Sequence, residues 1–155
     1  MSCFSDESLR EFSKSFEISD LAKIFYLIEK NALSRDPYWT EENYLAHILS
    51  SEDRVFLLKE NEEIKAFVFY RVIMSEMEIT HWSVLEKGKG RGACFFQEFL
   101  AQCGKKATKI ILECGEWNKA AENIYKKFSF TKTGFRPSYY KTGEGAWVME
   151  RNLNS

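Results

Sequence analysis

Residues 87–93 read Lys-Gly-Lys-Gly-Arg-Gly-Ala and lie between an expected strand and an expected helix. Three glycines at alternate positions let the backbone approach a ligand without clashes from Cβ atoms. The N-terminus of the following helix offers unpaired N–H groups and the positive end of a helix dipole. Lys87, Lys89 and Arg91 add positive charge. The segment is therefore typical of a diphosphate-binding loop, whereas a flexible solvated turn needs only one glycine.

The same loop also fits a second interpretation. Its spacing Gly88-x-Gly90-x-x-Ala93 satisfies a dinucleotide-binding fingerprint, and Glu113 follows 20 residues after Ala93, where an acid could bind a ribose. That fingerprint belongs to a doubly wound parallel sheet, but at least two strands that we expect to be antiparallel precede the loop. Only 62 residues follow Ala93, too few for the remaining strand–helix units. A dinucleotide-binding fold is therefore the least favoured alternative.

Hydrophobic periodicity divides the rest of the chain into helices and strands. A first helix is expected to be capped by Ser19-Asp20, with the apolar face Leu21, Ile24, Phe25, Ile28 and Ala32, and a second to be capped by Thr40. The remaining predicted elements are strands over 55–58, 64–72 and 77–84, a helix over 92–103 closed by Gly104, a strand over 108–114, a helix over 120–128, and strands over 131–140 and 146–152.

This order of elements predicts the fold class. It indicates an α+β fold in which helices flank a mixed, mostly antiparallel central sheet. The length of 155 residues predicts a single domain over residues 1–155. Residues 1–10 are polar, and we expect them to be disordered.

Composition excludes several classes of protein. The formal net charge of −1 argues against a nucleic-acid binder that relies on a general basic surface. No apolar run approaches the ~20 residues of a membrane helix, and the start has no apolar signal segment, so we expect a cytoplasmic protein that binds no membrane. The four cysteines lack C-x-x-C spacing and only two histidines accompany them, so we expect buried, reduced thiols and no metal site.

Two further segments carry candidate functional residues. Glu113 lies at the end of the expected strand 108–114. Asn118 opens the last expected helix, and Tyr125 lies seven residues later, two turns along the same face. Each residue has a purely structural alternative: an exposed strand-end charge, a helix N-cap and a core aromatic, respectively. Their occurrence together after the glycine loop favours a functional site.

The glycine loop and these residues resemble the acetyl-CoA signature of the GNAT acetyltransferases. That signature is a strand, a (Q/R)-x-x-G-x-(G/A) loop, a helix, a strand and N-x-x-A-x-x-x-Y; Gly90 and Gly92 match it, while Lys87 stands where the family has Gln or Arg. Within the family, residues 18–153 resemble the RimI branch, the ribosomal-protein N-terminal alanine acetyltransferases. The features that carry this finer resemblance are Ile28-Glu29, Tyr38-Trp39-Thr40, Leu112-Glu113, the 12-residue step from Glu113 to Tyr125, and Arg136-x-x-Tyr139-Tyr140.

The resemblance implies an acetyl-CoA-dependent N-acetyltransferase that acetylates the N-terminal α-amine of a protein. The RimI-like features imply that this protein is a ribosomal protein whose N-terminal residue is alanine. It implies that Glu113 is the general base, acting through water, and that Tyr125 protonates the departing thiolate. The implied cofactor-binding residues are Trp82, Ser83, Val84, Lys87, Gly88, Lys89, Gly90, Arg91, Gly92, Ala93 and Asn118.

The sequence leaves alternatives open for the acceptor and for catalysis. A GNAT protein can instead acetylate a small-molecule amine, or it can be a non-catalytic acyl-CoA-binding module. The presence of both Glu113 and Tyr125 argues against the module. The chain departs from the family pattern in a shortened link from Val84 to Lys87, in Ser129 where a glycine is usual, and in the bulky Trp117, which bears on the acceptor pocket.

Overall fold

The computed structural model describes residues 2–32, 37, 39–86, 88 and 90–153. Its elements, in chain order, are β1 (Ser2–Ser8), α1 (Leu9–Ser13), α2 (Ile18–Ala32), α3 (Glu41–Ile48), β2 (Arg54–Glu60), β3 (Glu63–Ile73), β4 (Glu76–Val84), α4 (Arg91–Cys103), the 3-10 turn η1 (Gly104–Lys106), β5 (Lys109–Gly115), α5 (Lys119–Lys127), β6 (Thr131–Arg136) and β7 (Ala146–Asn152). None of the described helices is long and apolar enough to span a membrane.

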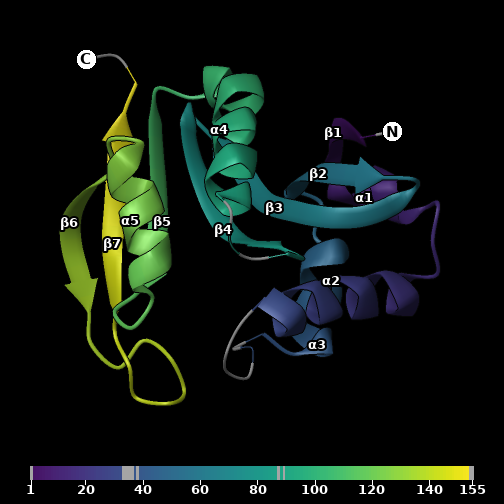
Figure 1. Cartoon of the computed structure of the whole chain (residues 1–155), viewed down its shortest axis with the longest axis horizontal. Helices are drawn as coiled ribbons and strands as arrows, with labels where there is room; N and C mark the ends of the chain where they lie inside the picture. Colours follow the sequence, from purple (N-terminus) through teal and green to yellow (C-terminus); the bar gives the residue numbers. More distant parts are fainter. Residues whose placement is uncertain (1, 33–36, 38, 87, 89, 154–155) are drawn as a thin grey trace.

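The seven strands form one sheet in the order β1-β2-β3-β4-β5-β7-β6 (Figure 1). Only the β4–β5 pair is parallel, because α4 crosses between these two strands; every other neighbouring pair is antiparallel. The predicted α+β class with a mixed, mostly antiparallel sheet is confirmed.

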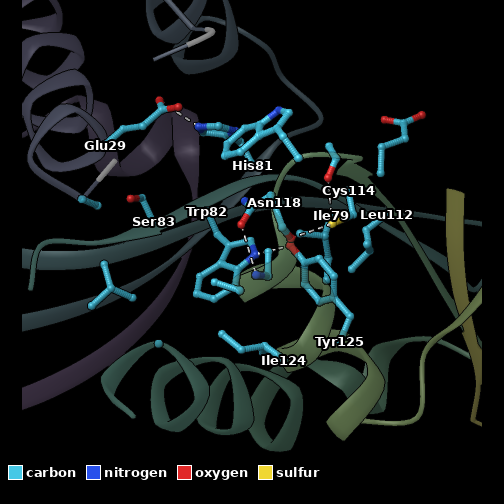
Figure 2. A pocket seen from close by; sticks show the side chains of 18 of the residues that line it. Glu29, Ile79, His81, Trp82, Ser83, Leu112, Cys114, Asn118, Ile124 and Tyr125 are labelled. Atoms are coloured by element: carbon cyan, nitrogen blue, oxygen red, sulfur yellow. Dashed lines mark hydrogen bonds and ion pairs between the residues drawn. The ribbon is translucent and has the colours of Figure 1, made fainter. Parts of the chain in front are cut away.

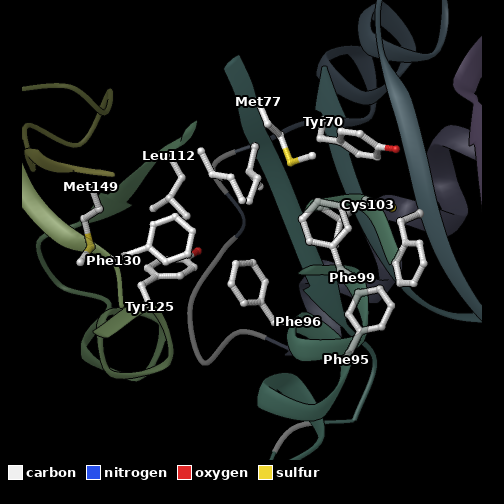
Figure 3. Packing of buried hydrophobic residues seen from close by; sticks show 14 of the residues in the cluster. Tyr70, Met77, Phe95, Phe96, Phe99, Cys103, Leu112, Tyr125, Phe130 and Met149 are labelled. Atoms are coloured by element: carbon white, nitrogen blue, oxygen red, sulfur yellow. The ribbon is translucent and has the colours of Figure 1, made fainter. Parts of the chain in front are cut away.

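Helices cover both faces of the sheet, and each face buries its own core. One core packs α4 and α5 against the sheet through an aromatic cluster that Figure 3 shows, with Phe95, Phe96 and Phe99 on the helix side. The other packs α1, α2 and α3 against β2 and β3, around Phe25 and Tyr44. Because successive residues of a strand point to opposite faces, β3 can bury Ala66, Val68 and Tyr70 in the first core and Phe67 and Phe69 in the second.

The polar start of the chain is ordered, contrary to the expectation of disorder. Residues 2–8 form edge strand β1, which pairs antiparallel with β2 from Ser2–Glu60 to Ser8–Arg54. Phe4 stacks on Phe56 with ring centroids 5.6 Å apart. The Asp6 carboxylate accepts a hydrogen bond from the Tyr70 hydroxyl at 2.5 Å and lies 3.3 Å from the Arg54 guanidinium. These contacts satisfy polar residues that the sequence alone presents as solvated.

Several predicted element ends also differ from the structure. Helix α2 begins at Ile18, so Ser19 and Asp20 lie in its first turn and do not cap it. Gly104 does not close α4 with a left-handed residue, because its φ of −60° continues the chain into η1. Strand β6 ends at Arg136. Thr40, in contrast, caps α3 as predicted, in a capping box with Asn43.

The cysteines divide into two groups. Cys103 and Cys114 are buried, as expected, but Cys3 and Cys94 are exposed, and all four thiols are free. Cys94 is exposed because Phe95 and Phe96, its neighbours in α4, face the core instead. Burial raises the pKa of the Cys103 and Cys114 thiols to about 11, which keeps them protonated and unreactive at neutral pH.

Candidate active site

The central feature of the site is a split in the sheet between β4 and β5. The two strands pair only from Glu76–Lys109 to Ile79–Leu112. Beyond that point β4 continues to Val84 along β3, while β5 continues to Gly115 along β7. Along residues 80–84, therefore, no described strand occupies the β5 side of β4. An extended ligand can pair with backbone groups at such an edge.

A cleft of about 420 Å³ fills this split. Its lining runs from the glycine loop, through β4 and the end of β5, to α2 and the segment after β6. The lining residues with polar or aromatic side chains on which the site depends are Glu29, Trp39, His81, Trp82, Ser83, Glu113, Trp117, Asn118, Tyr125, Tyr139 and Tyr140. Figure 2 shows Glu29 and His81 on one side of this region and Asn118 and Tyr125 on another. The split therefore brings together residues far apart in sequence.

The glycine loop leads into α4 at one end of the cleft. Gly88 and Gly90 have φ of +90° and +73°, which favours glycine at both positions. Gly88, Gly90, Gly92 and Ala93 all line the cleft. The Arg91 N–H donates to the Gly88 carbonyl, and helix geometry leaves the N–H groups of Gly92 and Ala93 without an intrahelical acceptor. These two N–H groups and the helix dipole make this end suited to an anion.

The three predicted cations of the loop have different outcomes. Lys87 and Lys89 lie outside the described residues. The Arg91 guanidinium forms an ion pair with Glu86 at 2.9 Å and is half exposed. Among the described residues of the loop, the backbone N–H groups of Gly92 and Ala93 are therefore the groups suited to an anion.

Asn118 and Tyr125 lie on α5, on the α4 side of the sheet. The Asn118 side-chain oxygen accepts a hydrogen bond from the Ala121 N–H at 3.1 Å, so the residue is an N-cap of α5 as well as part of the cleft wall. The Tyr125 hydroxyl accepts a hydrogen bond from Trp82 Nε1 at 2.7 Å. Burial raises the pKa of the Tyr125 phenol well above its usual range, so the hydroxyl carries its proton at neutral pH.

The Trp82 side chain fixes this arrangement. It stacks on Phe96 with ring centroids 5.1 Å apart, and its Nε1 is directed to the Tyr125 hydroxyl. Trp82 therefore does more than supply backbone, since its indole positions the phenol beside the cleft. The sequence pattern drew attention to the Trp82 main chain and missed this side-chain contact.

Glu113, near the end of β5, is held by Arg136, the last residue of β6, and by Tyr139 in the segment that follows. The Tyr139 hydroxyl donates to Glu113 Oε2 at 2.9 Å, and Arg136 Nε lies 3.2 Å from Oε1. Burial, followed by the bond to Glu113, raises the pKa of Tyr139 to about 12. These two contacts, with the Tyr139 hydroxyl and the Arg136 guanidinium, hold the Glu113 carboxylate in place at the end of β5.

Trp117 and Gly145 hold the acceptor end of the cleft in place. The Trp117 indole folds back over Gly115, where a Cβ atom would lie 2.6 Å from Nε1. The Gly145 N–H donates to the Glu116 carboxylate at 3.0 Å, and the Glu116 N–H donates to the Gly145 carbonyl at 3.0 Å. These bonds tie the loop after β5 to the connection between β6 and β7, beside Trp117, which lines the cleft.

The structure also places residues at this end that the sequence analysis did not select. Glu29 and Trp39 entered only as family-like features, and His81 was weighed only as a possible metal ligand. Glu29 lies on the buried face of α2, four residues after Phe25, and its side chain is only 4% exposed. His81 Nε2 lies 2.9 Å from Glu29 Oε2. A carboxylate on the apolar face of a helix was the available signal for this pair.

Comparisons with known proteins agree with this geometry. No protein-family model matches the chain. The chain is 26% identical over 139 residues to a Bacillus subtilis strain 168 protein named "Putative ribosomal protein bS18-alanine N-acetyltransferase", over 86% of this chain and 92% of that protein. Its structure is similar to that of the ribosomal-protein-S18-alanine N-acetyltransferase from Escherichia coli, with a TM-score of 0.76, 22% identity, and coverage of 99% of this chain and 94% of the other.

A further solved structure of similar fold contains bound acetyl-CoA. A GNAT family acetyltransferase from Elizabethkingia anophelis, solved with acetyl-CoA bound, matches with a TM-score of 0.60 and 18% identity, over 66% of this chain and 77% of the other. The chain has the GNAT fold. The GNAT resemblance, with its RimI-like character, is thereby confirmed. Within this GNAT fold, the split between β4 and β5 and the described residues of the glycine loop line the same cleft.

Proposed function

We propose that this chain transfers the acetyl group of acetyl-CoA to the N-terminal α-amine of a protein, and that the acceptor begins with alanine, as in a ribosomal protein. The observation that supports this most is the single cleft, which joins an anion-binding helix N-terminus, an unpaired strand edge and the pair Glu113 and Tyr125. An elongated thioester bound along this cleft has its diphosphate at one end and its acetyl group near the other.

The residues along the cleft fit acetyl-CoA in chemistry as well as in order. The N–H groups at Gly92 and Ala93 suit the diphosphate. The open edge of β4 from Trp82 to Val84 suits the amide groups of the pantetheine arm, and the amide of Asn118 lies on the facing wall. A backbone N–H near Val84 would polarise the thioester carbonyl and stabilise its oxyanion.

The proposed reaction forms an N–C bond and breaks the C–S bond of the thioester. The amine nitrogen attacks the acetyl carbonyl, and the tetrahedral intermediate collapses as the sulfur leaves. Tyr125 donates its proton to the departing thiolate, and Glu113 takes a proton from the attacking nitrogen through water. A protonated phenol is a reasonable donor, because it holds its proton across the whole neutral range.

The chemistry of the acceptor amine favours an N-terminus. An α-amine has a pKa of about 7.7–8.0, so neutralising it at pH 7 costs about 1–1.4 kcal/mol. A lysine amine at about 10.4 costs roughly 4.6 kcal/mol. The carboxylates of Glu29 and Glu113 line the acceptor end and attract either cation. The lower deprotonation cost is therefore the property that distinguishes the two acceptors.

A screen of acceptors tests this function. Calorimetry should show binding of acetyl-CoA and none of NAD, and acetyl transfer should be fastest to an N-terminal alanine peptide, compared with an N-terminally blocked lysine peptide and small polyamines. Preference for a polyamine would replace the proposed acceptor by the small-amine alternative. Binding of acetyl-CoA without transfer to any amine would instead indicate the non-catalytic acyl-CoA module.

A further inference from the structure

Both histidines of the chain pack against one tryptophan beside the acceptor end of the cleft. His81 stacks on one face of Trp39 with ring centroids 4.2 Å apart and planes 11° apart, and His47 stacks on Trp39 at 4.3 Å and 19°. Each imidazole also has its own carboxylate: His81 Nε2 lies 2.9 Å from Glu29, and His47 Nδ1 lies 2.7 Å from Asp53. The two histidines differ in one respect, because His81 lines the cleft and His47 is not among its described lining residues.

The Glu29 carboxylate is buried with few partners. Its side chain is 4% exposed, and it accepts a hydrogen bond from the Tyr44 hydroxyl in addition to its contact with His81. Burial raises the pKa of the Tyr44 phenol well above its usual range, and the charge of Glu29 and the hydrogen bond to it add to this effect. Tyr44 therefore donates to Glu29 as a neutral phenol. Among the described residues, no lysine or arginine forms an ion pair with Glu29. The only cation that the described surroundings of Glu29 can provide is therefore a protonated His81.

This arrangement is suited to an imidazole that takes up a proton. The Glu29 carboxylate lies 2.9 Å from Nε2 without making a hydrogen bond to it, so the contact between the two side chains is one of charge. A carboxylate at this distance attracts a positively charged imidazolium. The flat contact with Trp39 restricts the ring, and an indole face also favours a cation. The phenyl ring of Phe67 contributes another apolar wall at 6.2 Å. His81 is thus positioned and supported for proton uptake at the edge of the cleft.

Glu113 is the other candidate for the group that takes a proton from the amine, and its carboxylate already has two partners. One oxygen of the Glu113 carboxylate lies 3.2 Å from the Arg136 guanidinium and the other accepts from the Tyr139 hydroxyl, so an ammonium group that approaches Glu113 directly competes with both contacts. An acceptor amine must lose two protons in total: one before it can attack and one from the positively charged nitrogen of the intermediate. The second proton is far more acidic and can be taken by a weaker base.

We propose that His81, positioned by Glu29, takes the first of these two protons. Acceptor R–NH3⁺ gives a proton to the imidazole of His81, which becomes imidazolium, and the nitrogen lone pair of the amine then forms the N–C bond. The intermediate nitrogen loses its second proton through water to Glu113, the C–S bond breaks, and the sulfur takes the proton of Tyr125. The imidazolium and Glu113 release protons, one to restore Tyr125 and one to solvent. This inference rests on the proposed acetyl transfer.

The test compares pH profiles of kcat/KM for His81→Gln and wild type with an N-terminal alanine peptide. The variant depends on amine that is already neutral, about 9–17% of the total at pH 7 for an α-amine pKa of 7.7–8.0. We therefore expect a loss of about tenfold at pH 7 that shrinks to less than about twofold at pH 8.5. Glu29→Gln should show the same pH-dependent loss, because the uncharged amide cannot stabilise the imidazolium.

Two controls separate chemistry from packing. His47→Gln removes the other imidazole from the same stack and should leave kcat/KM unchanged at both pH values. Glu113→Gln should lose the same factor at pH 7 and pH 8.5, since the second proton must be removed at every pH. Acetyl-CoA affinity by calorimetry should be unchanged in the His81 and Glu29 variants, which shows that the cofactor end of the cleft is intact.

The outcomes distinguish this inference from the function on which it rests. A His81→Gln loss of equal size at pH 7 and pH 8.5, or matched by His47→Gln, would show that His81 only shapes the cleft. Full activity in His81→Gln would remove it from the reaction. If His81→Gln does not fold, a wild-type pH dependence in Glu29→Gln overturns the inference equally. Wild-type protein that binds acetyl-CoA but transfers nothing would instead overturn the proposed function.

Discussion

Tyr125→Phe removes one oxygen from the centre of the proposed site. Loss of a general acid typically lowers kcat by about 10²–10⁴, which is about 2.7–5.5 kcal/mol of transition-state stabilisation. The same change leaves the partly buried Trp82 Nε1–H without its acceptor at 2.7 Å, which costs about 1 kcal/mol of folding stability. At about 2–4 °C per kcal/mol for a chain of this size, the melting temperature should fall by several degrees.

Two measurements separate these effects. Single-turnover acetyl transfer gives the chemical step, and calorimetry with acetyl-CoA should show an almost unchanged Kd. Trp82→Phe is the matched control, because it breaks the same hydrogen bond but keeps the phenol, so it should lose stability with a much smaller loss of kcat. Activity of Tyr125→Phe within about twofold of wild type would refute the proton-donor role and leave Tyr125 as a core aromatic.

Three further perturbations test other parts of the molecule. Gly90→Asp should lower acetyl-CoA affinity by at least about tenfold (about 1.4 kcal/mol), because the new carboxylate repels a diphosphate. The control is Gly143→Asp, at another left-handed glycine with open space around it, which should leave the affinity unchanged. Equal affinities of the two variants by calorimetry would remove the loop from diphosphate binding. Asp6→Asn should lower the melting temperature more at pH 7 than at pH 3. Burial raises the pKa of Asp6, but hydrogen bonds from Lys106, Tyr70 and Arg54 bring that pKa below its usual value. The stabilisation from Asp6 is therefore present above its pKa in the unfolded chain and is lost as pH falls through its pKa in the folded protein. A decrease in melting temperature that is independent of pH would contradict this. Ser129→Gly should raise stability by about 0.5–1 kcal/mol because Ser129 has a φ of +68°, and no change in thermal unfolding would show that the strain is absent.

The parts of the site that follow one local pattern could be predicted from the sequence. The glycine loop, the N-cap at Asn118 and the position of Tyr125 two turns later depend on short-range spacing, and the structure places all three on the cleft. Ser129 is a related case. It stands where the family usually has glycine, and its left-handed backbone gives the physical reason for that preference.

The parts that depend on distant segments could not be predicted in this way. Strand β1 is polar, and its order comes from Arg54, Tyr70 and Lys106, none of which is near it in sequence. The grip of Arg136 and Tyr139 on Glu113 requires the connection after β6 to fold back over the end of β5. Periodicity shows which face of an element is buried, but it does not show which residues of other elements meet there.

The pairing of Glu29 and His81 illustrates the same limit. Glu29 lies within a buried helical face and His81 within a strand, and 52 positions separate them in the chain. Only the packing of α2 against the sheet brings the carboxylate within 2.9 Å of the imidazole. The available signal in the sequence was a carboxylate on the apolar face of a helix.

The central claim is acetyl transfer from acetyl-CoA to an α-amine, and one measurement tests it most directly. A peptide that begins with alanine and contains one internal lysine offers both amines to the purified protein in the same reaction with acetyl-CoA. Tandem mass spectrometry then locates the acetyl group. We expect one acetyl group on the N-terminal alanine and an unmodified lysine at pH 7. Acetylation of the lysine alone, or no enzymatic acetylation above that of the Tyr125→Phe variant, would contradict it.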